Sequence, residues 1–65
     1  MVQAESAENL QIDNIDFSLS YIRVHSRIDF DIQDVIFWEN VDYRIITKIN
    51  QGNRGFFEFI GEQIK

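Results

Sequence analysis

Cysteine and proline are both absent from the 65 residues of this chain. Without cysteine, no disulfide can cross-link the fold and no thiolate can bind a metal ion. The lack of thiols also fits a reducing compartment. A domain this short buries only about 60% of the surface that its unfolded chain exposes. Its stability must therefore come from a well-packed core or from oligomerisation.

Long apolar runs and an excess of basic residues are also missing. No stretch approaches the ~20 apolar residues that cross a bilayer, and the start has neither the basic nor the apolar region of a signal peptide. We therefore expect no membrane association. The net charge is −5, so diffuse attraction to nucleic acid is not favoured.

The apolar content of 45%, with 14% aromatic residues, is enough for a core and argues against a wholly disordered chain. The first 20 residues carry four acids and no base. We expect residues 1–14 to form an acidic leader, either disordered or with one helical turn in "AESAENL". Residues 15–65 are expected to form a single domain.

Residues 22–32 alternate in polarity. Arg23, His25, Arg27, Asp29 and Asp31 occupy one parity, whereas the other is apolar except for Ser26. This period of two predicts a long strand over 22–32, or two strands bent within it. The adjacent apolar residues Tyr21 and Ile22 change the inward parity and predict a bend, bulge or short turn near Ser20–Ile22.

The remaining sequence predicts a meander of three strands at 34–38, 43–50 and 56–60, joined by turns at "ENVD" and "QGNRG". The run from Val35 to Trp38 is expected to be covered on both faces. The fold class predicted is all-β, a small, partly open barrel of SH3 or OB type built on this C-terminal meander. If the leader does not close the barrel, an edge remains that a second subunit would cover.

Catalysis and metal binding have little support in the sequence. His25 is the only histidine, and Arg23 and Arg27 beside it disfavour its charged form, which is the wrong direction for a general acid. The serines lie in no nucleophile motif. Asp29, Asp31 and Asp34 lack the glycine and the terminal glutamate of a calcium loop. We therefore expect no enzyme activity, no metal and no cofactor.

Arg23, His25 and Arg27 form a basic row at strand spacing, about 13 Å long at ~3.3 Å per residue. The row could bind a carboxylate or phosphate on a partner. It could also pair with acids of the same sheet or of a neighbouring subunit, and the excess of acids favours such pairing. Nucleic acid would need aromatic stacking beside the bases, for which Tyr21 and Trp38 are candidates.

Aromatic and aliphatic residues are too numerous for one face of the meander. Ile36 and Trp38 lie on the parity opposite to Val35 and Phe37, and Phe56 opposes Phe57. The second face is either covered by the N-terminal segment or exposed as an interaction patch. Ile36, Trp38 and Phe56 are therefore candidate partner-binding residues.

From Tyr21 onward the order of motifs resembles a known family. The motifs are a strand, Asp-Val-x-Phe-Trp at 34–38, Tyr-Arg-Ile-Ile at 43–46 and Gly-Phe-Phe-Glu-Phe-Ile-Gly at 55–61. This order is similar to the small β-barrel proteins that join head to tail in tailed bacteriophages and prophages, namely the head-closure and tail-completion proteins. The resemblance covers the C-terminal two-thirds of the chain.

The resemblance implies a structural protein without catalytic residues, which assembles into rings and docks strands or loops on its neighbours. It implies protein partners, either further copies of the chain or connector and tail proteins, in the bacterial cytoplasm or in the virion. The alternative from the residues themselves is a small SH3- or OB-like adaptor that binds a peptide or nucleic acid through the same candidate face.

Overall fold

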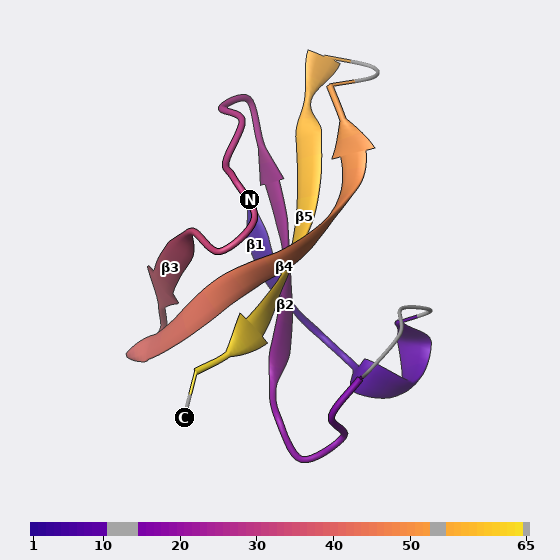
Figure 1. The fold of residues 1–65 in the computed structure, drawn as a ribbon, viewed down its shortest axis with the longest axis vertical. Helices are drawn as coiled ribbons and strands as arrows, with labels where there is room; N and C mark the ends of the chain where they lie inside the picture. The colour runs from indigo at the N-terminus through magenta and orange to yellow at the C-terminus, as the bar shows by residue number, and fades with distance from the viewer. Residues whose placement is uncertain (11–14, 53–54, 65) are drawn as a thin grey trace.

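The computed structural model describes residues 1–10, 15–52 and 55–64. These residues form one antiparallel sheet of five strands and a short 3-10 helix, η1, at Ala7–Asn9. The strands are β1 (Val2–Glu5), β2 (Tyr21–Ser26), β3 (Val35–Trp38), β4 (Val41–Gln51) and β5 (Phe57–Gln63). Their spatial order is β1-β2-β5-β4-β3 (Figure 1), and the sheet curls into a half-barrel. The predicted all-β, partly open barrel on a C-terminal meander is confirmed.

β4 bends strongly across the molecule (Figure 1), and its irregular pairing with β5 accompanies this curl. Register shifts lie between Ile45 and Thr47 and between Lys48 and Asn50. Such irregularities increase the local twist of a strand. They also change which residues of β4 point to each face of the sheet. Ile45 belongs to the core on the inner face, and Ile46 packs on the core of the outer face. Lys48 then lies opposite Phe59 of the inner face.

The inner face of the curled sheet holds the main core. Its buried residues are Ile22, Val24, Tyr43, Ile45 and Phe59. Phe30, from the loop between β2 and β3, covers this core with its ring edge-on to Phe59 at a centroid distance of 5.6 Å. Complete burial of a large aliphatic or aromatic side chain contributes about 1.5–3 kcal/mol. These side chains therefore form the principal stabilising cluster of the fold.

A second, smaller core lies on the outer face. Leu10, Tyr21 and Ile60 are buried there, with Ala7, Ile15, Leu19 and Ile46 packed around them. Tyr21 and Ile22 are both buried because each faces a different core. The bend, bulge or short turn predicted near Ser20–Ile22 therefore does not interrupt β2, and the structure has a turn just before it. The chain turns before β2, at residues 17–19, and β2 then pairs in continuous register with β1 and β5.

The acidic leader is more ordered than the sequence predicted. Val2–Glu5 form β1, which pairs antiparallel with β2, so a disordered leader is wrong for these residues. η1 supplies the one helical turn, with the Ser6 side chain accepting a hydrogen bond from the Glu8 N–H. Residues 11–14 lie outside the described part of the chain.

The long strand predicted over 22–32 ends at Ser26. Ser26 pairs with Phe57, the first residue of β5, and beyond this point the described residues offer no strand partner. The Ser26 hydroxyl accepts the Ile28 N–H at 2.9 Å, which turns the backbone out of the sheet. Residues 27–34 therefore form a loop, and Gln33 takes a left-handed conformation, with φ of 82°, before β3 begins.

The predicted hairpin is confirmed with a tighter turn. β3 and β4 are separated only by Glu39 and Asn40, whose φ angles are 50° and 65°. Two successive left-handed residues are the signature of a type I′ turn, which matches the twist of the strands. The next predicted turn also exists, with Gly52 and Gly55 at positive φ, although residues 53–54 are outside the described part.

Candidate interaction sites

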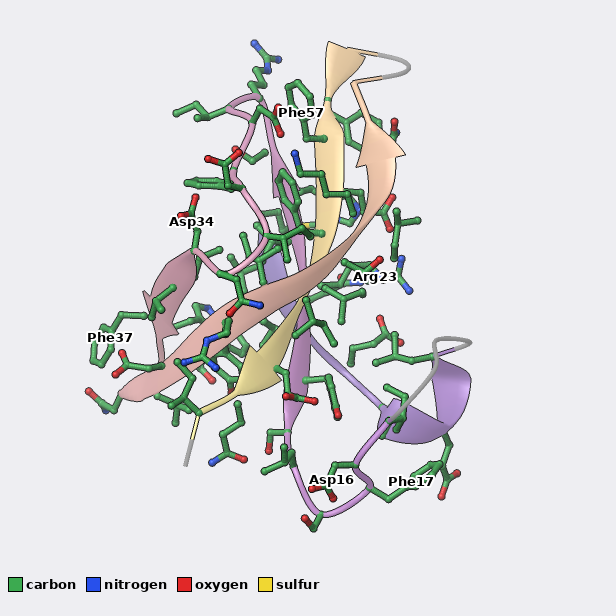
Figure 2. All side chains as sticks on the ribbon, in the orientation of Figure 1. Asp16, Phe17, Arg23, Asp34, Phe37 and Phe57 are labelled. Carbon is green, nitrogen blue, oxygen red and sulfur yellow. The ribbon has the colours of Figure 1, made fainter. Side chains whose placement is uncertain are left out.

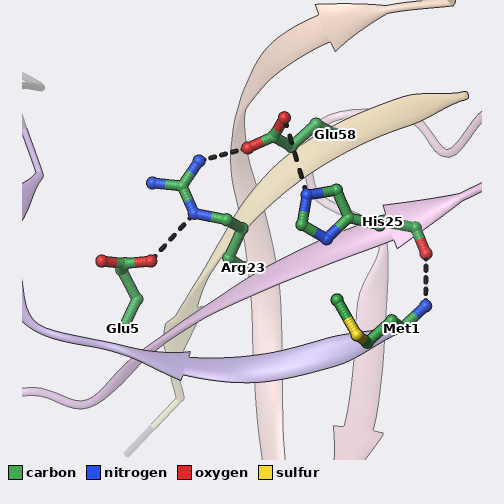
Figure 3. A network of polar contacts seen from close by, with 5 residues as sticks. All are labelled: Met1, Glu5, Arg23, His25 and Glu58. Carbon is green, nitrogen blue, oxygen red and sulfur yellow. Dashed lines mark hydrogen bonds and ion pairs between the residues drawn. The ribbon is translucent and has the colours of Figure 1, made fainter.

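The predicted basic row divides into two parts because only some of its residues meet acids. Arg23 donates from Nε to Glu5 of β1 at 2.8 Å and from a terminal nitrogen to Glu58 of β5 (Figure 3). The side chains of Glu5 and Glu58 are each 14% exposed. Hydrogen bonds to these carboxylates raise the pKa of Arg23. For Arg23, pairing within the sheet is confirmed, and its guanidinium is not free for a partner.

His25 lies two residues after Arg23 on β2 and faces Glu58. Its Nε2 is 3.7 Å from a carboxylate oxygen of Glu58, and its backbone pairs with Met1 (Figure 3). The other ring nitrogen, Nδ1, is buried and finds no hydrogen-bond partner among the described residues. Buried polar atoms are nearly always paired, so an unpaired one marks a position where a ligand or water can bind.

Arg27 follows β2 and is exposed, and it forms no ion pair with any described residue. Phe56 precedes β5, and its ring lies 5.6 Å from the His25 ring, between centroids. His25, Ser26, Arg27 and Phe56, together with Met1, line an open cavity of about 430 Å³. We call this the His25 cavity. Three predicted partner-binding residues, His25, Arg27 and Phe56, thus meet at one place.

Ile36 and Trp38 are not part of that cavity. Both are half-buried and pack against the inner core, with the Trp38 ring 6.4 Å from that of Tyr43 between centroids. The neighbouring residues of β3, Val35 and Phe37, are 53% and 68% exposed. The expectation that this run is covered on both faces is therefore wrong. The apolar side chains it presents to solvent are Val35 and Phe37 (Phe37 is labelled in Figure 2).

Within the part of the chain that the structure describes, β3 is also an edge strand of the sheet, with β4 as its one neighbour. The Ile45 N–H donates to the Asp34 carbonyl at 2.8 Å, and this bond fixes which residues of β3 direct their backbone groups toward β4. In an antiparallel pair, every second residue turns its N–H and C=O away from the partner strand. For β3 those residues are Val35 and Phe37. We call these two residues, with their outward backbone groups, the β3 edge.

The charges around the β3 edge are mostly negative. Asp34 precedes the strand, Glu39 is in its turn, and Asp42 is paired with Phe37, and all three are exposed. Among the residues of β3, its turn and the paired part of β4, Arg44 is the one base, and it pairs with Val35. The β3 edge therefore combines apolar side chains and free backbone groups with an acidic border.

The described residues contain no group of three or more histidine, cysteine or acidic side chains placed to hold a metal ion. Asp29 instead pairs with Lys48 at 3.0 Å, and the Asp34 carboxylate accepts the Asp31 N–H at 2.9 Å. No helix in the described part is long and apolar enough to cross a membrane.

Sequence reasoning named three of the five residues that line the His25 cavity, namely His25, Arg27 and Phe56, but missed the β3 edge. The alternation in 35–38 showed two apolar parities without indicating which one faces the core. The two residues of the turn, Glu39 and Asn40, are not one of the glycine-containing pairs that mark a tight hairpin, so no clear sequence signal pointed to this edge. Comparisons of the chain with protein-family models, curated proteins and solved structures found no match.

Proposed function

We propose that this chain is a structural protein that acts by protein–protein contact, as the resemblance to phage and prophage head–tail joining proteins implies. The observation that carries the proposal is the β3 edge. Extended partners bind such edges by adding a strand, and main-chain hydrogen bonds supply much of the affinity. Exposed apolar edges are otherwise blocked by charge or covered, because they promote association.

A second copy of the chain is the first partner to consider. Among residues 1–10, 15–52 and 55–64, β1 and β3 have one strand neighbour each, so this part of each copy presents two edges. Pairing β3 of one copy with an edge of another would cover Val35 and Phe37. It would also stabilise a domain with a small core, because association buries additional apolar surface.

Native mass spectrometry over a range of protein concentrations tests this proposal. The wild-type chain should form dimers or larger species, and Phe37→Lys should remain monomeric because a charge at an edge position opposes strand addition. Thr47→Lys, a half-buried position on β4 away from the edge, is the matched control for added charge. Equal assembly of the wild type and Phe37→Lys would contradict the proposal.

Salt separates self-association from a basic partner. Two acidic β3 edges repel each other, so self-association should strengthen as salt screens the charges, whereas a complex with a basic segment should weaken. A wild-type chain that is monomeric at every concentration and salt level, with no salt-sensitive complex with a basic extended peptide, would exclude this edge as the working surface.

The His25 cavity favours a second candidate, the small adaptor that binds a peptide or nucleic acid. Arg27 and the neighbouring rings of His25 and Phe56 line the same cavity, and base stacking on aromatic rings is a general mode of single-strand binding. A mobility shift with single-stranded DNA that weakens with salt, and that is lost in Arg27→Glu, would support nucleic acid. The net charge of −5 makes a protein partner the stronger proposal.

A further inference from the structure

We propose that the His25 cavity is a binding site for a carboxylate attached to an apolar group, such as the C-terminal residue of a partner chain. The inference does not depend on the β3 edge. It rests on one cavity that brings together a free guanidinium, an unpaired buried ring nitrogen and an aromatic wall.

The polar side of the cavity is arranged for an anion. Arg27 lines the cavity and forms no ion pair with any described residue, and guanidinium groups bind carboxylates through two parallel N–H donors. Nδ1 of His25 is the second candidate donor. Glu58 lies on the Nε2 side of the ring, at 3.7 Å, and leaves the Nδ1 side without a partner among the described residues.

The acids nearest to this position do not block an anion because they are already occupied. Glu58 is held by Arg23 as well as facing His25, and Glu5 is held by the same guanidinium on the other side (Figure 3). The charged groups around the ring are therefore the acids Glu5 and Glu58, the guanidinium groups of Arg23 and Arg27, and the amino group of Met1. The three cations outnumber the two acids there.

The other wall of the cavity is apolar and selects among anions. The ring planes of Phe56 and His25 are inclined to each other by 58°, and Met1 also lines the cavity. A phosphate dianion needs several donors and gains nothing from an aromatic wall. A monoanionic carboxylate needs one guanidinium and one further donor, and its apolar substituent can pack on Phe56. Capture of a chain terminus by such a site is an established recognition mode.

Nuclear magnetic resonance titration of the full chain tests this assignment. The probe is a short peptide ending in phenylalanine with a free C-terminal carboxylate, compared with the same peptide ending in an amide and with inorganic phosphate. We expect the free peptide to shift the ring nitrogen signals of His25 and the ring signals of Phe56, with the amidated peptide and phosphate binding at least about tenfold more weakly.

Two pairs of variants locate the binding atoms. Arg27→Gln should weaken binding about tenfold or more, while Arg44→Gln removes the same charge from β4, where Arg44 pairs with Val35 and does not line the cavity, and should leave binding unchanged. His25→Asn keeps a polar atom near the position of Nδ1, whereas His25→Gln keeps one near Nε2. We expect His25→Asn to retain more binding than His25→Gln.

Three outcomes would overturn the inference. The first is that no peptide shifts the signals of His25 and Phe56. The second is that the free and amidated peptides bind equally, or that phosphate binds more tightly than the free peptide. The third is equal loss in Arg27→Gln and Arg44→Gln, which would indicate general charge attraction. The thermal midpoint of each variant shows whether it is folded, and Arg27→Lys, which keeps the charge, supplies a further folded comparison.

Discussion

Arg23 illustrates how a single side chain fastens three strands. It extends from β2 to Glu5 on β1 and to Glu58 on β5, so one guanidinium neutralises two acids that are largely shielded from water. The same arrangement removes Arg23 from the predicted docking row. A residue that the sequence suggests for recognition is used instead to stabilise the sheet.

Replacing Arg23 by Met should destabilise the fold by about 2 kcal/mol, because it leaves two partly buried carboxylates without a counter-charge. Lys48→Met is the control, since its pair with Asp29 is half exposed and should contribute only about 0–1 kcal/mol. Urea unfolding of both variants measures the difference. Adding Glu5→Gln and Glu58→Gln to Arg23→Met should restore part of the loss, and an equal effect of the two single Met variants would refute the role assigned to Arg23.

Tyr21 is the second residue whose environment has a measurable consequence. Burial raises the pKa of its hydroxyl above the ordinary value of 10.0, and the hydrogen bond to Glu62, at 2.7 Å, acts in the same direction. The folded state therefore holds the proton more tightly than the unfolded chain. The stability that this provides is complete below about pH 10 and is lost as the pH rises through the folded pKa.

Tyr21→Phe removes this titration. At neutral pH the variant should be less stable by about 1–2 kcal/mol, because the Asp16 N–H and Glu62 lose the hydroxyl. From about pH 9 to about pH 11 its stability should fall less steeply than that of the wild type. Urea titrations across this range measure both slopes, and the remaining titrating groups are common to the two proteins. Parallel slopes would contradict the buried hydroxyl.

At the scale of the elements, β5 is the centre of the sheet, and it requires a small residue at one position. Gly61 pairs with Ile22 on one side and with Ile45 on the other. A Cβ atom added there would lie 3.0 Å from Cγ1 of Ile22 and 3.1 Å from Cβ of Tyr43. The inner core thus closes over the backbone of β5 at Gly61.

Gly61→Ala should therefore lower the free energy of unfolding by about 1–3 kcal/mol through overpacking, even though alanine normally stabilises a regular strand relative to glycine. Thermal unfolding gives the magnitude. The double variant with Ile22→Val should show a smaller cost for the alanine than the wild-type background does, because the nearby aliphatic side chain is shorter. An alanine that is neutral in both backgrounds would show that this approach does not limit the sheet.

At the scale of the whole molecule, the open half-barrel leaves strand edges whose backbone is unequally protected. The backbone N–H and C=O groups of Val35 and Phe37 point away from β4, whereas those of Ile36 and Trp38 point toward it. This alternation follows from the hydrogen bond of Asp34 with Ile45. It gives the edge a pattern that can be read residue by residue in solution.

Amide hydrogen exchange of the monomer should therefore be fast at Val35 and Phe37 and slower at Ile36 and Trp38. In an assembled state, the first two amides should gain protection if β3 accepts a further strand. Measurements at low and high protein concentration compare the two states. Uniform exchange along β3 in the monomer, or assembly without added protection at these positions, would place the interface elsewhere.

The sequence by itself determined the fold class, the hairpin and the absence of a disulfide. Alternating polarity and turn residues act over a few neighbours, so the strands in 34–38, 43–50 and 56–60 could be located from local pattern. The same local signal misled over 22–32, where polarity continued to alternate after the pairing partner had ended. It also could not show the register shifts in β4, which exchange its faces after Ile45.

Tertiary structure alone decided which charged and apolar residues are available. Arg23 is occupied because Glu5 and Glu58, distant in sequence, lie beside it, whereas Arg27 extends past the end of the sheet. Val35 and Phe37 are exposed because β3 directs its other parity into the inner core. Both outcomes depend on strand pairing between remote segments, and the alternation within one segment carries no information about its partner.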